Sequence, residues 1–280
     1  MPSERRLGPG DALAVLALAG TALVIARPIL AGGHVTYIDN AVHLAEIHDL
    51  AARGATGWSE LGFAGFPLGT LHSPLWYGAL AALVRLGAPP EPLYRAALLL
   101  GYLAPPLALY AVGRVRLGPI AAGVLGWLFL VQPPAIWGIG SPLGGMWTYA
   151  LATAALVLLF ELHSRPALTR RGHLVASVVL AIAALTHLFL LPLVGLLAAT
   201  ALATHQLEGT LTRRELRLRL TGFTLAALAS AAYWLTLVLV GNQGAAPTQA
   251  FDVRGLAYRL LLPADAMFLL DERLDESVRQ

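Results

Sequence analysis

Cysteine and lysine are both absent from this sequence of 280 residues, and only 12% of its residues are charged. The lack of cysteine excludes disulfides and thiol chemistry. The lack of lysine means that all 19 basic residues are arginines. Scarce charge, with 57% hydrophobic residues and a mean hydropathy of +0.68, excludes the composition of an ordinary soluble domain. We therefore predict an integral membrane protein.

Apolar runs fill the chain where charge is missing. They cover about residues 11–31, 74–86, 93–112, 117–137, 147–162, 174–203 and 220–240. Several approach the roughly 20 residues with which a helix spans a bilayer, and they are too long and too rich in Leu and Ala for barrel strands. We predict an all-α, polytopic transmembrane helical bundle over residues 1–241. Residues 242–280 would form an extracytoplasmic tail, which could be the start of a longer region.

The first run could be read as a cleaved signal peptide. Arg27 and Pro28 interrupt it, however, and it lacks a good cleavage site of small residues. We interpret it as an uncleaved helix whose start lies in the cytoplasm.

The arginines fall in short clusters between the apolar runs, a distribution that marks membrane topology and argues against nucleic acid as a partner. The 74–86 run is too short to cross untilted, so we expect it to be re-entrant or to reach half depth. We expect the long 174–203 run to be a hairpin of two helices, broken near residues 186–192. Arg114 and Arg116, with the arginines of 165–171 and 213–219, then all become cytoplasmic.

The longest polar stretch, at about residues 32–73, is rich in acids and holds a single arginine, so it should be extracytoplasmic. An amphipathic helix at the membrane interface is predicted within it, because apolar residues recur there with an approximately helical period. These residues are Ile38, Val42, Ala45, Ile47 and Leu50.

Three polar residues of this stretch are candidates for chemistry. Asp39 and His43 are four residues apart and would share one face of a helix, with Glu46 a further turn along. The carboxylate could act as a general base toward a hydroxyl, and the histidine could orient it, share its proton or join it on a metal. The alternative is a solvated face of an amphipathic helix.

Three residues outside the loop are further candidates. Arg27 could bind a lipid phosphate, although snorkelling to the headgroups explains it as well and is favoured. His187, in an apolar run, is either functional or hydrogen-bonded at a helix break. Trp147 belongs to an interfacial belt or stacks on a sugar. In this topology the first loop, the 138–146 turn and the hairpin tip with His187 converge on the outer side.

The segment from Tyr37 to Tyr77 resembles a known family. It contains Tyr37-Ile-Asp39-Asn-Ala-Val-His43, Gly65-Phe66-Pro67-Leu68 and Ser73-Pro74-Leu75-Trp76-Tyr77. These motifs resemble bacterial membrane proteins known as 6-pyruvoyl-tetrahydropterin synthase-related, a historical label that implies no pterin chemistry. Those proteins are similar to the GT-C glycosyltransferases, which place an aspartate in the first extracytoplasmic loop and transfer a sugar from a polyprenyl-phosphate donor.

The resemblance implies a GT-C-like protein that crosses the bacterial plasma membrane several times and binds membrane lipids and a lipid-linked sugar. Asp39 would be the base toward an acceptor hydroxyl or the ligand of a divalent metal, and His43 would match the family histidine. The chain departs from the pattern in having no second acid in the 138–146 turn. That departure keeps a second hypothesis open, a non-catalytic scaffold that binds a lipid or a partner. A transporter ranks third, since it would need paired repeats of broken helices and buried acids.

Overall fold

The computed structural model of the chain describes residues 7–31, 40–54, 58–59, 66–67, 74–132, 142–165, 167–186 and 191–242. Within them the predicted all-α class is confirmed. The helices are α1 (Pro9–Leu30), α2 (Asn40–Arg53), α3 (Pro74–Arg85), α4 (Pro90–Leu117), α5 (Pro119–Val131), α7 (Trp147–His163), α8 (Arg170–Thr186), α9 (Leu191–Leu207) and α10 (Arg213–Asn242), with a short 3-10 helix η1 (Pro142–Gly144). One antiparallel pairing of two residues each joins β1 (Trp58–Ser59) to β2 (Phe66–Pro67).

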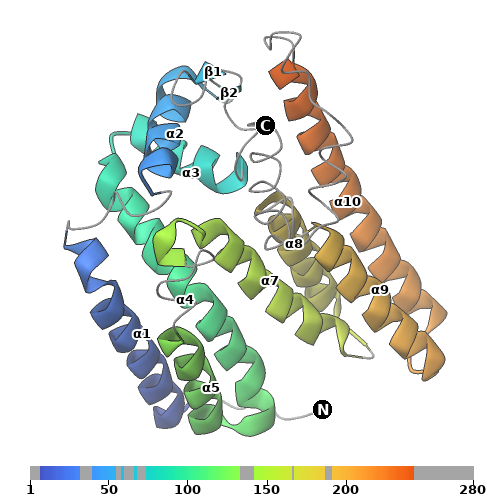
Figure 1. Cartoon of the computed structure of the whole chain (residues 1–280). Coiled ribbons are helices and arrows are strands. Elements are labelled where there is room, and N and C mark those ends of the chain that lie inside the picture. Colours follow the sequence, from blue (N-terminus) through green and yellow to red (C-terminus); the bar gives the residue numbers. More distant parts are fainter. Residues whose placement is uncertain are drawn as a thin grey trace, which may run out of the picture.

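The helices form two groups with α7 between them (Figure 1). On one side α1, α4 and α5 pack together, and on the other α8 packs against α10. α7 contacts both α4 and α8, so it joins the two groups. The larger buried apolar cluster lies among α1 to α5 and the start of α7, and a smaller one lies among α7, α8 and α10.

Two predictions concern the apolar runs, and of these the re-entrant or half-depth position of the 74–86 run stays a prediction. The short run becomes the 12-residue helix α3, about 18 Å long, which lies beside α2. The guanidinium of Arg85 at its end donates from Nε to Ala51 O at 2.6 Å, while Tyr77 near its start contacts His43. α3 therefore runs in the same direction as α2. The 174–203 run is divided as expected, because α8 ends at Thr186 and α9 begins at Leu191.

The arginines of four helix termini gather at one end of the bundle. Arg116 at the end of α4 reaches Glu161 near the end of α7, with Nη2 to Oε2 at 2.7 Å. Asp11 at the start of α1 pairs with Arg114 at 3.0 Å. The starts of α8 and α10 meet there as well, since His173 contacts Glu215. We call this the arginine-rich end and define it by Arg114, Arg116, Arg165, Arg170, Arg171, Arg213, Arg214, Arg217 and Arg219.

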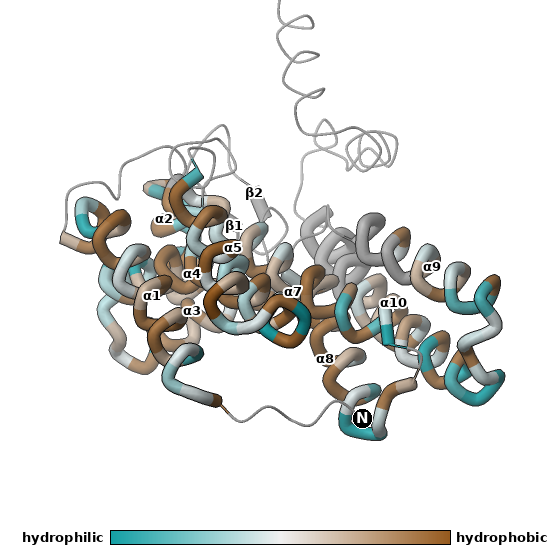
Figure 2. Tube along the Cα trace, turned by 90° about the horizontal axis from the view of Figure 1, so that it is seen from below, coloured by the Kyte–Doolittle hydropathy of each residue, from teal (hydrophilic) through white to brown (hydrophobic). Residues whose placement is uncertain are grey.

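Hydrophilic residues gather at the turn from α9 to α10, while the middles of the helices are hydrophobic (Figure 2). Among the described helices, α1 and α4 are long and apolar enough to cross a membrane by length and composition, with mean hydropathies of 2.1 and 1.6. Leu75–Arg85, Pro119–Val131 and Trp147–His163 are apolar but shorter. Length and composition thus single out fewer helices than the predicted polytopic bundle requires.

Candidate functional site

Helix α2 turns its polar residues inward. Asn40, His43 and Glu46 are buried together with Ile47 and Leu50. The predicted apolar face is therefore only partly right: Ile47 and Leu50 are buried as expected, but the side chain of Val42 is 50% exposed. The hypothesis of a solvated polar face is wrong for His43 and Glu46. The burial of His43 and Asn40 is explained by the neighbouring helices α3 and α4, because the hydroxyl of Tyr77 contacts His43 and that of Tyr94 donates to Asn40.

His43 is held by a tyrosine of α3. The hydroxyl of Tyr77 lies 2.7 Å from His43 Nδ1, and the two ring centroids are 5.6 Å apart. Tyr77 is itself almost completely buried. This contact holds Nδ1 of the histidine in place and so orients the imidazole ring. An imidazole that acts as an acid or base must be oriented in this way.

Asn40, the first residue of α2, bridges two distant segments. The hydroxyl of Tyr94 on α4 donates to Asn40 Oδ1 at 2.8 Å, and Asn40 Nδ2 donates to Leu143 O in η1 at 3.0 Å. The asparagine is fully buried, so both ends of its amide are held inside the protein. Asp39 directly precedes it in the sequence but lies outside the described residues. The beginning of α2 is thus fixed within one residue of the predicted catalytic acid.

Trp147 lies at the centre of an aromatic cluster, which we define as Trp76, Tyr77, Tyr94 and Trp147. Its ring centroid is 5.6 Å from that of Tyr77, 6.4 Å from Trp76 and 6.5 Å from Tyr94. The residue is buried among these rings, which contradicts both its assignment to an interfacial belt and the alternative that it stacks on a sugar. The reason is the close approach of α4, where Gly101 leaves room for Trp147 on the opposing helix.

The described neighbours of the three predicted polar features lie together, while the convergence of these features on the outer side of a membrane stays a prediction. Asn40 stands next to Asp39, and Leu143 belongs to the 138–146 turn. Trp76 Nε1 donates to Thr186 Oγ1 at 2.8 Å, directly before His187, which is itself outside the described residues. We call Asn40, His43, Glu46 and the aromatic cluster the α2 site. Arg27 is exposed on the last turn of α1.

A second polar cluster, at the arginine-rich end, was missed by the sequence prediction, which treated residues 213–219 as a topology anchor that could touch anionic lipid. Arg219 is buried and donates from Nε to Glu215 Oε1 at 3.1 Å and from Nη1 to His163 O at 2.9 Å. His205 Nε2 lies 2.9 Å from the same carbonyl oxygen. The cluster therefore binds the end of α7 to α9 and α10.

Glu215 is the acidic centre of this second cluster. It accepts hydrogen bonds from Leu168 N at 3.1 Å and from Arg219, and His173 Nε2 lies 3.1 Å from its Oε2. Burial alone would raise the pKa of Glu215, but the hydrogen bonds from Arg219 and His173 outweigh it and hold that pKa below its ordinary value. The spacing of Thr212 and Glu215 is that of a capping box, a signal that could have revealed the residue, and Glu215 N does donate to Thr212 Oγ1 at 3.2 Å.

The lowered pKa of Glu215 predicts a loss of stability in acid. A depressed carboxyl pKa contributes stability above the ordinary value of about 4.3, and that contribution fades as the pH falls through the folded-state pKa. Thermal unfolding of wild type and Glu215→Gln in detergent, from about pH 6 to about pH 3, should show a gap in Tm that narrows with acid. A difference in Tm that stayed constant or widened as the pH fell would contradict the lowered pKa of Glu215.

No group of three or more His, Asp or Glu side chains is arranged to hold a metal ion within the part of the chain that the structure describes. Asp39 lies outside that part of the chain. Comparisons with models of protein families, with curated proteins and with solved structures found no match to this chain.

Proposed function

We propose that the chain is a multi-pass protein of the bacterial plasma membrane with a GT-C-like organisation. The arginine-rich end would lie in the cytoplasm, because arginine-rich loops are retained there during insertion. Nine described arginines stand at that end against four acids, Asp11, Glu161, Glu208 and Glu215. The end that carries α2 has only Arg27, Arg53, Arg85 and Arg95 among the described residues. The polarity of the bundle supports an outer position for the α2 site.

Exposed apolar side chains along the helices support the same placement. On α1 they include Leu13, Leu16, Leu23 and Val24, and on α5 Ile120, Val124 and Leu128. α8 and α10 likewise expose Leu174, Val175, Val178, Leu225 and Leu228. Acyl chains would cover such side chains in a bilayer, whereas large exposed apolar patches are rare on soluble monomers.

At the α2 site we propose transfer of a sugar from a polyprenyl-phosphate donor, with Asp39 as base toward the acceptor hydroxyl or as ligand of a divalent metal. The observation that carries this proposal is the double hydrogen bond of Asn40, which fixes the residue next to Asp39 between α4 and η1. A reacting group must be held on rigid elements to act efficiently, and buried polar groups within an apolar bundle are typical of functional sites. Arg27 would meet the lipid phosphate at the headgroups.

Replacement of the acid tests the reaction. Purified protein in vesicles would be given radiolabelled sugars on polyprenyl phosphate, and transfer to a hydroxyl acceptor would be counted. We expect Asp39→Asn to lower transfer by about 100-fold or more, since general-base catalysis contributes at least that factor. Asp49→Asn, a matched control within α2, should transfer normally. Unchanged transfer by Asp39→Asn would exclude the catalytic role.

The rival proposal is a non-catalytic scaffold that keeps this architecture and binds a lipid. One observation favours it. The amide of Asn40 makes its hydrogen bonds inside the protein, and the ring of Trp147 packs in the hydrophobic core. It predicts that wild type and Asp39→Asn bind polyprenyl phosphate equally and that neither transfers sugar. Transfer by wild type would reject it.

A further inference from the structure

Two tyrosines from other helices hold buried polar residues of α2, and a single indole ring lies against both of these tyrosines. The hydroxyl of Tyr77 on α3 lies 2.7 Å from His43 Nδ1. The hydroxyl of Tyr94 on α4 donates to Asn40 Oδ1 at 2.8 Å. The centroid of the Trp147 ring lies 5.6 Å from that of Tyr77 and 6.5 Å from that of Tyr94. A movement of this indole ring would therefore act on both contacts.

The backbone that carries this indole is fixed against α4 and α2. Trp147 is the first residue of α7, and a Cβ at Gly101 of α4 would lie only 2.8 Å from its Cα. Four residues before it, the carbonyl oxygen of Leu143 accepts a hydrogen bond from the amide of Asn40. The short segment 143–147 thus touches the α2 site with its backbone at one end and with the indole ring at the other.

Contacts with other rings hold the indole in place. Trp147 is 1% exposed, and its Nε1 has no hydrogen-bond partner within the part of the chain that the structure describes. Its third aromatic neighbour is Trp76, whose ring centroid lies 6.4 Å away at an interplanar angle of 64°. Trp76 is itself tied to the end of α8, because its Nε1 donates to Thr186 Oγ1 at 2.8 Å. The indole is therefore enclosed by three aromatic rings, one of which is anchored to the second group of helices.

We propose that Trp147 is a positioning residue of the α2 site, which acts on His43 through Tyr77. By keeping the phenol ring in place, it holds the Tyr77 hydroxyl at Nδ1 of the histidine. A phenol hydroxyl is a stronger donor than acceptor, because the lone pairs of its oxygen are delocalised into the ring. The hydroxyl therefore donates to an Nδ1 without a proton, and the neutral imidazole carries its proton on Nε2.

This tautomer decides which atom of His43 can take part in proton transfer. Nδ1 is engaged by the Tyr77 hydroxyl, so the proton that the neutral ring can give to a neighbouring group is the one on Nε2. The use of that proton in sugar transfer rests on the proposed function. The tautomer itself is a property of the protein without any substrate, so it can be measured independently of transfer.

NMR of the ring nitrogens measures this tautomer in the detergent-solubilised full chain, after labelling with isotope-enriched histidine. His43→Gln identifies the signals of His43, and the pH is set where the ring is neutral. We expect wild type to favour the tautomer protonated at Nε2. Tyr77→Phe should lower this preference about tenfold, the contribution of one buried hydrogen bond. Trp147→Leu should lower it about threefold, since a pair of packed aromatic rings contributes about that factor beyond burial.

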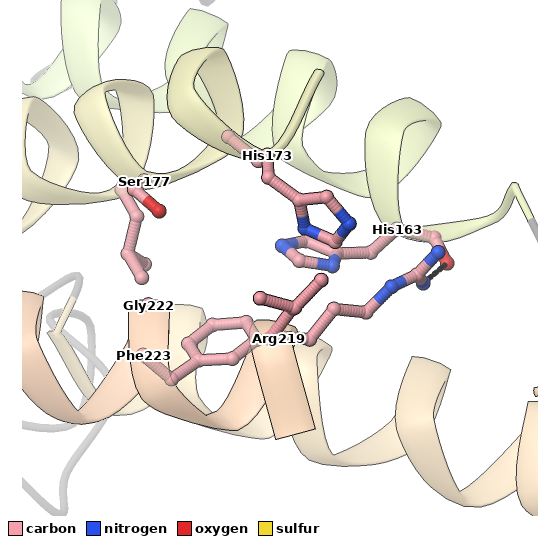
Figure 3. Close-up of a pocket in the computed structure, with 9 residues that line it drawn as sticks. His163, His173, Ser177, Arg219, Gly222 and Phe223 are labelled. Atoms are coloured by element: carbon pink, nitrogen blue, oxygen red, sulfur yellow. Dashed lines mark hydrogen bonds between the residues drawn. The ribbon is translucent and has the colours of Figure 1, made fainter. Parts of the chain in front are cut away.

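Further variants show whether Trp147 acts through the Tyr77 hydroxyl. In a chain that already carries Tyr77→Phe, Trp147→Leu should cause no further change in the tautomer of His43. Trp127→Leu removes a tryptophan that is 43% exposed on α5 and should leave the tautomer as in wild type. His163 and His173 line a hollow at the arginine-rich end (Figure 3), so their signals should stay unchanged in all of these variants.

Trp147→Phe keeps an aromatic ring and takes the place of Trp147→Leu if that variant does not fold. Its preference should lie between those of wild type and Tyr77→Phe. The proposal is overturned if wild type mixes both tautomers or favours Nδ1, if the folded Trp147 variant keeps the wild-type preference, or if Trp147→Leu acts equally with and without the hydroxyl. The expected tautomers without any sugar transfer would refute the proposed function and support the positioning role of Trp147.

Discussion

Replacing Glu215 with leucine should lower the free energy of unfolding by about 3 to 5 kcal/mol, the usual cost of leaving a buried charge without its partner. The guanidinium of Arg219 is buried and relies on Glu215 for its charge neutralisation. The same substitution removes the acceptor of Leu168 N and the partner of His173. Unfolding of the purified protein in detergent, followed by circular dichroism, measures the loss.

Two companion variants separate the ion pair from a general effect of removing an acid. Glu208→Leu changes an exposed acid in the turn before α10 and should shift the stability by less than about 0.5 kcal/mol. The double variant Glu215→Leu with Arg219→Met should recover much of the loss, because it removes both charges together. A double variant no more stable than Glu215→Leu alone would show that Arg219 is not the group left unsatisfied.

Introducing a methyl group at Gly101 should lower the stability of the protein about as much as Glu215→Leu does. A Cβ at this position would lie 2.6 Å from Trp147 Cβ and 2.8 Å from Trp147 Cα, distances that real side chains do not tolerate. Because one contact is to the backbone of α7, rotation of a side chain cannot relieve it. We expect Gly101→Ala to cost about 3 kcal/mol of stability through overpacking.

Gly20→Ala is the matched control for this substitution. Gly20 also lies within an apolar helix, α1, but a Cβ there would meet nothing within 4 Å. Alanine should therefore be neutral or slightly stabilising at residue 20, because it favours the helix. Equal effects of the two substitutions on thermal unfolding would contradict the close packing of α4 on α7.

The helices were predictable because the signals that define them are local. The short 74–86 run and the break at residues 186–192 follow from the length of apolar segments and the position of Pro192, and both appear in α3, α8 and α9. The gathering of arginines at one end follows from their spacing between these runs. Each of these features can be read from a short window of sequence.

The inward face of α2 could not be predicted in the same way. Periodicity assigns polar residues to the solvent, but His43 and Asn40 are buried because Tyr77 and Tyr94, which are distant in sequence, offer hydrogen bonds to them. Trp147 was misplaced for a related reason, since only the contact with Gly101 reveals that it packs inside. The prediction therefore placed a helix in the right segment, while the surroundings of His43 depend on tertiary contacts.

The membrane orientation of the bundle is best tested by labelling single cysteines, for which this chain is well suited because it contains no native cysteine. Ala52→Cys places an exposed thiol at the end of α2, and Gln206→Cys places one at the arginine-rich end. In intact cells stripped of the outer membrane, an impermeant maleimide should label Ala52→Cys at once and Gln206→Cys only after permeabilisation. Labelling of Gln206→Cys alone, or recovery of both variants in the soluble fraction, would contradict the proposed outer position of the α2 site.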